Sequence, residues 1–329
     1  MPLNRLWFIT TPRTASNLLI RILATDRQPN TIPGEYFCQQ ALNVLEESGC
    51  LEKPLGDWSS HEISKIGNIY QESFDQLQAF VKAAGDKRIV LKEHALFVID
   101  PATRVRPADS AAKHELLCKV KNSEMSCLSL PDLPPNVTVF PDEFLASWFP
   151  VLLIRHPAVA FPSYYRTYST HWAKTPEERE AMKGEIQTAM TLRWARSLYD
   201  WYLALWEQIG SDANLPRPIV LDAEDYMSDP EMIERFCDTV GLDSSKLQLS
   251  WEPASKEALE NTDPGKRRMR DTLFASTCIN PEKIKREISL QEEVQKWQLE
   301  FGEDDARKIA DWVKSALPDY EFLRERRFT

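Results

Sequence analysis

Residues 5–25, RLWFITTPRTASNLLIRILAT, contain the pattern that indicates the fold of this chain. The stretch begins with the apolar run 6–9, whose aromatic and β-branched side chains favour a buried strand. Pro12 ends strand pairing because proline has no N–H to donate. Apolar residues then recur over 18–23 with the spacing of one helix face. The stretch therefore predicts a strand, a tight polar loop and an amphipathic helix.

The loop between this strand and this helix carries the donors of an anion site. Arg13 supplies a guanidinium, and Thr14, Ser16 and Asn17 add hydroxyl and amide groups. The backbone N–H groups of such a loop and of the helix N-terminus converge on one place. An ordinary strand-to-helix turn with a Ser or Thr N-cap is the alternative interpretation. The loop is not a Walker A motif, because it lacks the GxxxxGK[ST] pattern.

Further apolar runs alternate with helical patterns along the rest of the chain. Residues 87–94, 148–154 and 218–221 are typical of buried strands. Helical patterns cover residues 39–86, 158–166, 176–209 and 229–240. Strands that alternate with helices in this way predict an α/β fold with three layers, in which helices flank a central, mainly parallel sheet.

Ionisable residues end two of the predicted strands. Lys92 and His94 lie at the end of the second strand, and Arg155 directly follows the third. Open α/β sheets bind their ligands at the carboxyl ends of the strands. A neutral imidazole suits a proton acceptor near pH 7, and an arginine fork suits a phosphate. The alternatives are a solvated strand end with a satisfied histidine and an arginine in a structural ion pair.

Composition restricts the class of protein. The chain has 329 residues, of which 43% are hydrophobic, so it can bury a large core. Its 40 basic and 50 acidic residues give a net charge of −10, which argues against nucleic acid as a partner. The six cysteines and five histidines lack metal-ligand spacing, so we expect no metal. No signal peptide or membrane-length apolar run is visible, which predicts a cytoplasmic protein with reduced cysteines and no membrane partner.

The loop at residues 12–17 resembles the 5′-phosphosulfate loop of sulfotransferases that use 3′-phosphoadenosine-5′-phosphosulfate (PAPS). In that family a Pro-Lys/Arg-Ser/Thr-Gly-Thr/Ser-Thr sequence joins a strand to a helix. Ala15 replaces the usual glycine, and alanine is strained if this position needs a positive φ. The resemblance implies a P-loop NTPase-like fold and a cofactor-binding loop made of Arg13, Thr14, Ala15, Ser16 and Asn17.

A second part of the resemblance lies after the third strand. Sulfotransferases bind the nucleotide 3′-phosphate with an arginine at this strand end and a serine eight positions later. Arg155 and Ser163 have this spacing, and a Tyr-Tyr pair follows the serine as in the family. The resemblance therefore implies that both residues bind the cofactor.

The resemblance also implies catalytic residues. Gly34-Glu35-Tyr36 is similar to the segment that holds the general base in tyrosyl-protein and trehalose-type bacterial sulfotransferases. Lys92-Glu93-His94 is similar to the Lys-Thr-His of cytosolic sulfotransferases, where the lysine contacts the transferring group and the histidine takes the acceptor proton. Glu35, His94, Lys92 and Arg13 are therefore the expected catalytic residues, and Glu35 and His94 are alternatives as the base. A plain surface carboxylate is the other interpretation of Glu35.

A basic segment near residue 266 is loosely similar to the family's late Arg-Lys-Gly segment, which closes over the 3′-phosphate. Lys266, Arg267 and Arg268 are the expected equivalents, although the final glycine is missing, and Arg270 and residues 271–277 are further candidates. A solvated basic face is the alternative. We expect residues 1–329 to form a single domain, with an irregular insertion or lid at about 101–147 where prolines interrupt any period.

The expected activity is in-line transfer of a sulfuryl group from PAPS to a hydroxyl or amine of a small-molecule acceptor, with 3′-phosphoadenosine-5′-phosphate (PAP) as product. A non-catalytic nucleotide- or phosphate-binding protein on the same fold is the first alternative. Sulfonation that drives an elimination or a cyclisation is another. A small-molecule kinase is disfavoured because the Walker lysine is missing. The sequence leaves the acceptor open, and it leaves the choice between monomer and homodimer open.

Overall fold

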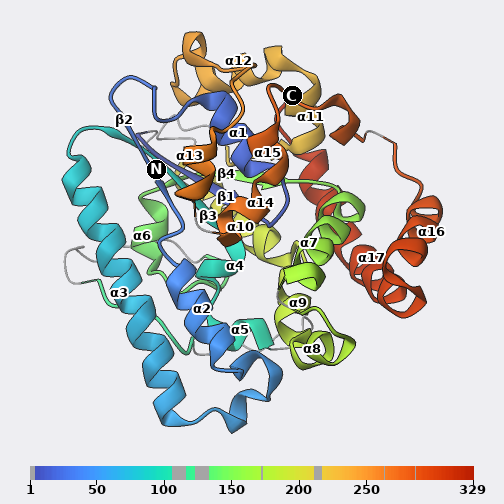
Figure 1. Cartoon of the computed structure of the whole chain (residues 1–329). Coiled ribbons are helices and arrows are strands. Elements are labelled where there is room, and N and C mark those ends of the chain that lie inside the picture. The colour runs from blue at the N-terminus through green and yellow to red at the C-terminus, as the bar shows by residue number, and fades with distance from the viewer. Residues whose placement is uncertain are drawn as a thin grey trace.

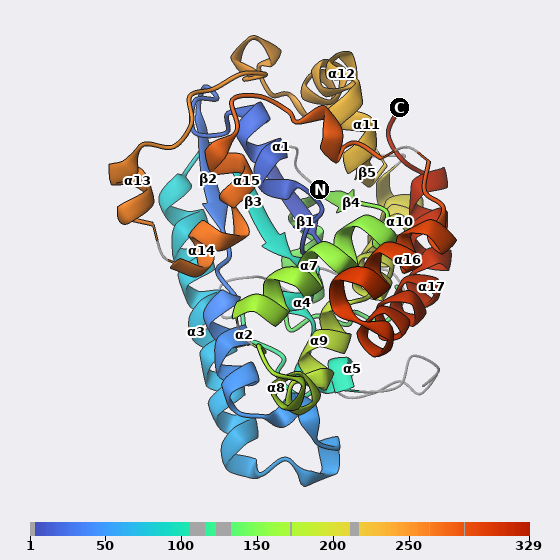
Figure 2. The same ribbon diagram turned by 45° about the vertical axis from the view of Figure 1, so that its right-hand side comes forward.

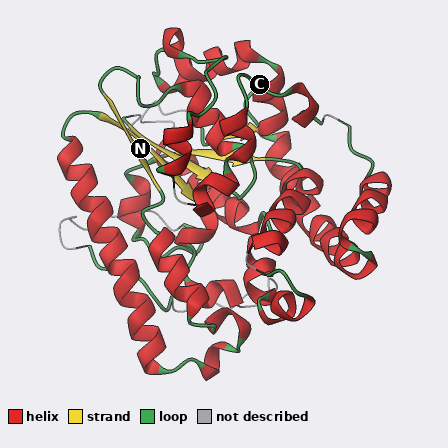
Figure 3. Ribbon diagram, viewed as in Figure 1, coloured by secondary structure: helices red, strands yellow, loops and turns green. Residues whose placement is uncertain are grey.

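The computed structural model describes residues 4–105, 116–122, 133–171, 173–210, 217–262, 264–285 and 287–329. Its centre is a sheet of five parallel strands in the order β2-β3-β1-β4-β5, surrounded by helices (Figures 1 and 3). The strands are β1 (Arg5–Thr10), β2 (Thr31–Glu35), β3 (Arg88–His94), β4 (Phe149–Ile154) and β5 (Ile219–Asp222). The predicted α/β class with a central parallel sheet is confirmed.

Most helices before β5 lie in the predicted helical segments. The first group comprises α1 (Ser16–Leu23), α2 (Gln39–Glu47), α3 (Ser60–Ala84), α4 (Ala95–Val98), α5 (Pro101–Val105) and α6 (Asp142–Ala146). The short helices α4, α5 and α6 were not predicted. The next group comprises α7 (Pro157–His171), α8 (Pro176–Ala181), α9 (Lys183–Ala189) and α10 (Arg193–Leu205). The segment 39–86 is interrupted by short 3₁₀ turns at Cys50–Glu52 and Leu55–Asp57, next to the glycines that punctuate it.

The remaining helices carry the chain across the sheet to the C-terminus. They are α11 (Ala223–Ser228), α12 (Pro230–Val240), α13 (Lys256–Glu260), α14 (Pro264–Met269), α15 (Asp271–Ala275), α16 (Leu290–Phe301) and α17 (Glu303–Glu325). Asp229 caps α12 with its side chain, and Gly241 ends that helix in a left-handed conformation, as the Asp-Pro and Gly signals predict. Figures 1 and 2 both show α15 beside α1.

The three layers follow from the alternation of side chains along the strands. Leu6 and Phe8 of β1 point into a core that α1, α11 and α12 complete. Trp7 and Ile9 point to the opposite face, into a core that includes side chains of α2, α3 and α10. Because helices cover both faces of the sheet, the sequences of β1 and β4 are nearly continuous apolar runs. A third cluster joins α7 to α16 and α17.

One strand differs from the sequence expectation. Thr31–Glu35 forms the edge strand β2, paired in parallel with β3, although its sequence TIPGE contains proline and glycine. An edge position tolerates Pro33 because one side of the strand needs no ladder donor. The pairing is important for the site, because its register places Glu35 opposite Lys92.

The region 101–147 is described only in part. The N–H of Val120 donates to the carbonyl of Val139, and the N–H of Val139 donates to that of Val98, which ties these residues to the end of α4. Residues 106–115 and 123–132 of the expected insertion lie outside the described residues. The single domain and the insertion remain predictions.

Candidate active site

A cavity of about 950 Å³ opens at the carboxyl ends of the strands. Its walls come from the loop after β1, the first turn of α1, the ends of β2, β3 and β4, helix α7, and the segment from α14 to residue 283. The cavity wall includes the predicted residues Arg13, Ala15, Ser16, Asn17, His94, Arg155, Ser163 and Arg268. The fold thus brings together residues that are up to about 250 positions apart in sequence.

The loop after β1 contains two residues in the left-handed region, Arg13 with φ 67° and Ala15 with φ 55°. The hydroxyl of Tyr226 donates to the carbonyl oxygens of Thr14 (3.2 Å) and Ala15 (3.0 Å). In a trans peptide the N–H points opposite to the carbonyl, so the N–H groups of Ala15 and Ser16 point away from Tyr226. Because these two residues line the cavity, the loop has the form of an anion cradle.

Arg13 links the loop to two other elements. Its Nε donates to Ser163 Oγ (3.0 Å) on α7, and its Nη1 donates to the carbonyl of Met269 (2.9 Å). Burial lowers the pKa of Arg13, and the nearby Arg155 and Arg166 lower it further. Cations gathered in one cavity of an acidic protein favour an anionic ligand there.

Arg155 is held from behind in a fixed orientation. Its Nε donates to Glu224 Oε1 (2.9 Å) and its Nη2 donates to the carbonyl of Lys283 (2.6 Å). Oε2 of Glu224 accepts from the backbone N–H of Lys285 (2.7 Å), so the carboxylate itself is anchored. A buried arginine fixed in this way presents a planar fork to a ligand at little further entropy cost.

Glu35 and Lys92 form an ion pair at the end of β2 and β3. Lys92 Nζ lies 2.7 Å from Glu35 Oε2 and donates to Asn17 Oδ1 (2.6 Å), which connects the pair to the loop. Arg270 Nη2 also donates to both oxygens of Glu35, at 2.9 and 3.1 Å. Burial raises the pKa of Glu35, but Lys92 and then Arg270 outweigh it and hold the pKa at about 2.

His94 lies at the end of β3, with Thr10 opposite it in the register. Its Nδ1 is 2.5 Å from Thr10 Oγ1 and its Nε2 is 3.3 Å from the Tyr36 hydroxyl. Burial, and then the charge of Lys92, lower the pKa of His94 to about 3. The imidazole is therefore neutral at pH 7, and its two nitrogens are oriented by hydroxyl groups.

The remaining predicted residues lie outside the cavity wall. Thr14 is buried and its hydroxyl donates to the carbonyl of Thr11 (2.8 Å). Glu35 and Lys92 lie behind the lining residues Arg270 and Asn17, which they contact. Arg267 is exposed and does not line the cavity, whereas Arg268 does and pairs with Asp271 at 3.0 Å. The side chain of Lys266 lies outside the described part of the chain.

Some residues of this site were not identified from the sequence. Glu224 and Tyr226 lie in α11, just after β5, where Glu224 orients Arg155 and Tyr226 bonds the loop. Tyr36 has φ 58°, and its ring lies 4.5 Å from Lys92 Nζ. The signal for Glu224 is its position three residues after the predicted strand 218–221, near a strand end like Arg155. None of the described residues of 101–147 lines the cavity.

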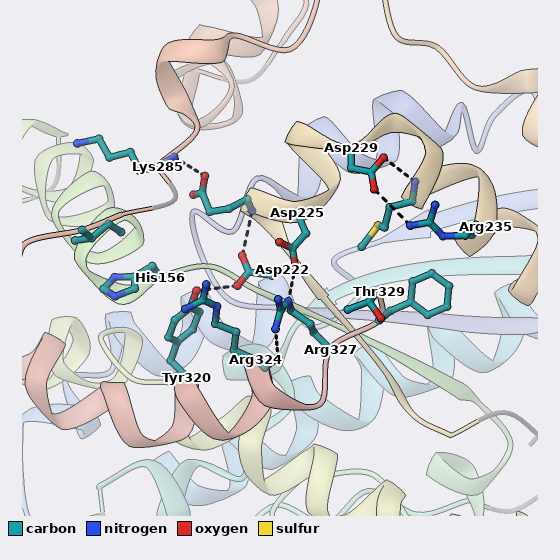
Figure 4. A pocket seen from close by; sticks show the side chains of 14 residues that line it. His156, Asp222, Asp225, Asp229, Arg235, Lys285, Tyr320, Arg324, Arg327 and Thr329 are labelled. Atoms are coloured by element: carbon teal, nitrogen blue, oxygen red, sulfur yellow. Dashed lines mark hydrogen bonds and ion pairs between the residues drawn. The ribbon is translucent and has the colours of Figure 1, made fainter.

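A second, smaller cavity of about 470 Å³ is lined by Glu224 among other residues. Figure 4 shows this cavity from close by. Four of its charged residues form two ion pairs with one another, and Lys285 pairs with Glu293, which does not line the cavity. Asp222 accepts from Tyr320 (2.7 Å), Arg327 pairs with Asp225 (2.6 Å) and Arg235 with Asp229 (3.4 Å). Glu224 connects this cavity to the site, because it bonds Arg155. The larger cavity, whose wall includes most of the predicted residues, is the candidate active site.

Two further findings concern the described residues as a whole. No group of three or more His, Cys, Asp or Glu side chains among them is placed to hold a metal ion. Within the same ranges, no helix is long and apolar enough to cross a membrane.

Comparison with known proteins gives relatives that cover almost the whole chain. The chain is 36% identical over 336 residues to a protein named sulfotransferase ppzF from Metarhizium rileyi, and the match covers 98% of this chain and 96% of the relative. It is also 36% identical, over 334 residues and with the same coverage, to sulfotransferase ppzF of Metarhizium majus. No protein-family model matches the chain.

Proposed function

We propose, from the premise that this chain belongs to the sulfotransferase family, that it transfers a sulfuryl group from PAPS to a hydroxyl or amine of a small-molecule acceptor. The observation that carries the proposal is the convergence of the loop after β1, Arg155 and Ser163 on one cavity. The donor has a 5′-phosphosulfate for the loop and a 3′-phosphate for the arginine and serine. A protein of net charge −10 that gathers arginines in one cavity is suited to such a polyanion.

In this proposal the residues of the site have separate tasks. The N–H groups of the loop, Arg13 and Lys92 stabilise the charge that grows on the bridging oxygen as the S–O bond to the nucleotide breaks. Glu35 or His94 takes the proton of the attacking acceptor group. The sulfuryl group passes to the acceptor oxygen or nitrogen, and PAP leaves with the electron pair of the broken bond.

The acceptor side of the cavity supports a small organic acceptor. Leu42, Leu96 and Phe97 line it together with Tyr164 and Tyr168. Apolar and aromatic walls with a few polar groups are typical of sites for small molecules. Sulfonation converts a hydroxyl of the acceptor into a sulfate ester, from which sulfate leaves readily. Elimination or cyclisation after transfer is therefore a variant of the same proposal. We also propose that the protein is cytoplasmic and that it is a monomer or a homodimer.

The experiment that tests the proposal is the binding of PAP, with ATP and AMP as controls. We expect PAP to raise the unfolding temperature and to bind at least tenfold more tightly than AMP, because only PAP engages both anion sites. Ser163→Ala should weaken PAP binding, and its unfolding is measured in parallel because the change removes the acceptor of Arg13 Nε. Arg155→Ala should weaken it more, and its unfolding is measured in parallel because it leaves Glu224 unpaired. A folded protein that does not distinguish PAP from AMP would contradict the proposed donor.

One observation favours the alternative of a non-catalytic nucleotide-binding protein. The pKa of Glu35 is about 2 and that of His94 about 3, and both values are low for a general base. Tight PAP binding without turnover on a broad panel of hydroxyl and amine acceptors would support this alternative.

A further inference from the structure

Arg270 lines the cavity and contacts Glu35, which is not one of the lining residues. Its Nη2 donates to both oxygens of Glu35. Lys92 Nζ is a second partner of Oε2. These contacts use three of the roughly four acceptor sites of the carboxylate, and the two cations hold its pKa at about 2. Glu35 therefore becomes a stronger base when one of the two cations leaves.

The two cations differ in their freedom to leave. Lys92 is on a central strand, its side chain is 2% exposed, and it also donates to Asn17. Arg270 lies between the short helices α14 and α15, and its side chain is 23% exposed. Its contact with the 37% exposed Glu35 is a partly solvated ion pair, which costs little to break. Arg270 is therefore the partner that can move.

The same segment contacts the anion loop. The carbonyl of Met269, the residue before Arg270, accepts from Arg13 Nη1 at 2.9 Å. Arg270 and Arg13 thus border the same part of the cavity, where the proposed donor places several negative charges. Phosphate and sulfate oxygens compete well for a guanidinium, because charge-assisted bonds to them are strong and bidentate.

Resting on the donor proposed above, we propose that Arg270 is a further donor-binding residue that exchanges partners: it pairs with Glu35 in the free protein and with the anionic groups of the nucleotide in the complex. Donor binding then uncovers Glu35 and directs it to the acceptor. The exchange makes proton removal depend on a bound donor, because the basicity of Glu35 rises when Arg270 moves from the carboxylate to the nucleotide.

A double-mutant cycle with PAP as the probe tests the exchange. The affinity of PAP is measured calorimetrically for the wild type, Glu35→Gln, Arg270→Met and the double variant. In the wild type, PAP competes with Glu35 for Arg270, so Glu35→Gln should tighten PAP binding about twofold to fivefold. Arg270→Met should weaken PAP, and in its background Glu35→Gln should have almost no effect.

Arg268→Met is the matched control, since Arg268 lies on the same segment and lines the cavity but pairs with Asp271. In this background Glu35→Gln should tighten PAP as much as in the wild type. A second measurement is the coupling between Glu35 and Arg270 in the free energy of unfolding, which should be present without PAP and absent at saturating PAP. This readout separates an exchange from a contact that only supports the fold.

Three outcomes would overturn the exchange. They are an equal gain from Glu35→Gln in all backgrounds, weaker PAP binding by Glu35→Gln, and a coupling in unfolding that persists at saturating PAP. Each of these leaves the proposed donor intact, because PAP still binds to the wild type. Failure of the wild type to bind PAP would instead overturn the donor and the exchange together.

Discussion

Ala15 shows how one residue departs from its local preference at the site. It has φ 55° and ψ 24°, in the left-handed region where the Cβ of an L-residue is crowded. The resemblance to the sulfotransferase loop predicted strain if residue 15 needed a positive φ. The structure has this positive φ at Ala15. The surrounding contacts hold the conformation, because Tyr226 bonds the Ala15 carbonyl and the N–H groups of Leu18 and Leu19 donate to it.

At this position we expect Ala15→Gly to raise the free energy of unfolding by about 0.5–1 kcal/mol, since the relief of strain exceeds the entropy that glycine adds to the unfolded chain. Urea unfolding measures the change. Ala79→Gly, at an exposed position in the interior of α3, is the control with the opposite sign and should lower the free energy of unfolding by about 1 kcal/mol. A lower stability of Ala15→Gly would show that the loop is not strained at residue 15.

Strand β2 is an element whose formation depends on its neighbours. Its sequence contains Pro33 and Gly34, both of which disfavour a strand. A Cβ added at Gly34 would lie 3.0 Å from two atoms of the Phe80 ring and 3.1 Å from Phe37. Gly34 therefore allows β2 to approach α3 closely, and this approach places Glu35 next to Lys92.

Two glycine substitutions test this description of the elements. Gly34→Ala should lower the free energy of unfolding by about 1–3 kcal/mol, because the methyl group overpacks the contact with Phe80. Gly67→Ala, in the interior of α3 with open space around its Cβ, should raise it by about 1 kcal/mol through helix propensity. Chemical unfolding of both variants gives the values. Equal signs for the two would contradict the close packing of β2 on α3.

At the scale of the whole molecule, buried ionisable groups make stability depend on pH in two directions. Burial raises the pKa of Glu93 to about 8, above the ordinary 4.5 of a glutamate. Between these values the folded protein binds a proton that the unfolded chain does not, so stability falls as pH rises. His94 and His156 have pKa values lowered to about 3 and 4, mainly by burial. They bind fewer protons when folded, so stability also falls as pH drops below 6.5.

Glu93→Gln isolates the first of these effects. The amide keeps an acceptor for the N–H of Cys38, which bonds Glu93 Oε2 at 3.2 Å, but it cannot ionise. We expect the variant to gain stability relative to the wild type as pH rises from 5 to 8. Urea unfolding at both pH values measures the difference. Parallel pH profiles for the two proteins would show that Glu93 ionises in the folded state as it does in the unfolded chain.

The sequence by itself determined the α/β class, four of the five strands and the helix that ends at Gly241. These features depend on local patterns: continuous apolar runs such as 149–154, helical periods, and Asp-Pro or Gly signals at helix ends. The loop at residues 12–17 was also recognised from its local pattern, and the pair Arg155 and Ser163 from its resemblance to sulfotransferases; all but Thr14 of these residues lie at one cavity. Their roles in donor binding remain proposals.

Only the tertiary structure decided which residues from distant segments meet. The strand β2 forms because β3 supplies its backbone hydrogen-bond partners. The register of this pairing places Glu35 opposite Lys92. Arg270 reaches Glu35 across 235 positions of sequence, and Glu224 reaches Arg155 across 69. Spacing along a chain carries no information about such contacts, because packing of the sheet and its helices fixes them. The supports of the site, and the contact that covers Glu35, were therefore visible only in the folded protein.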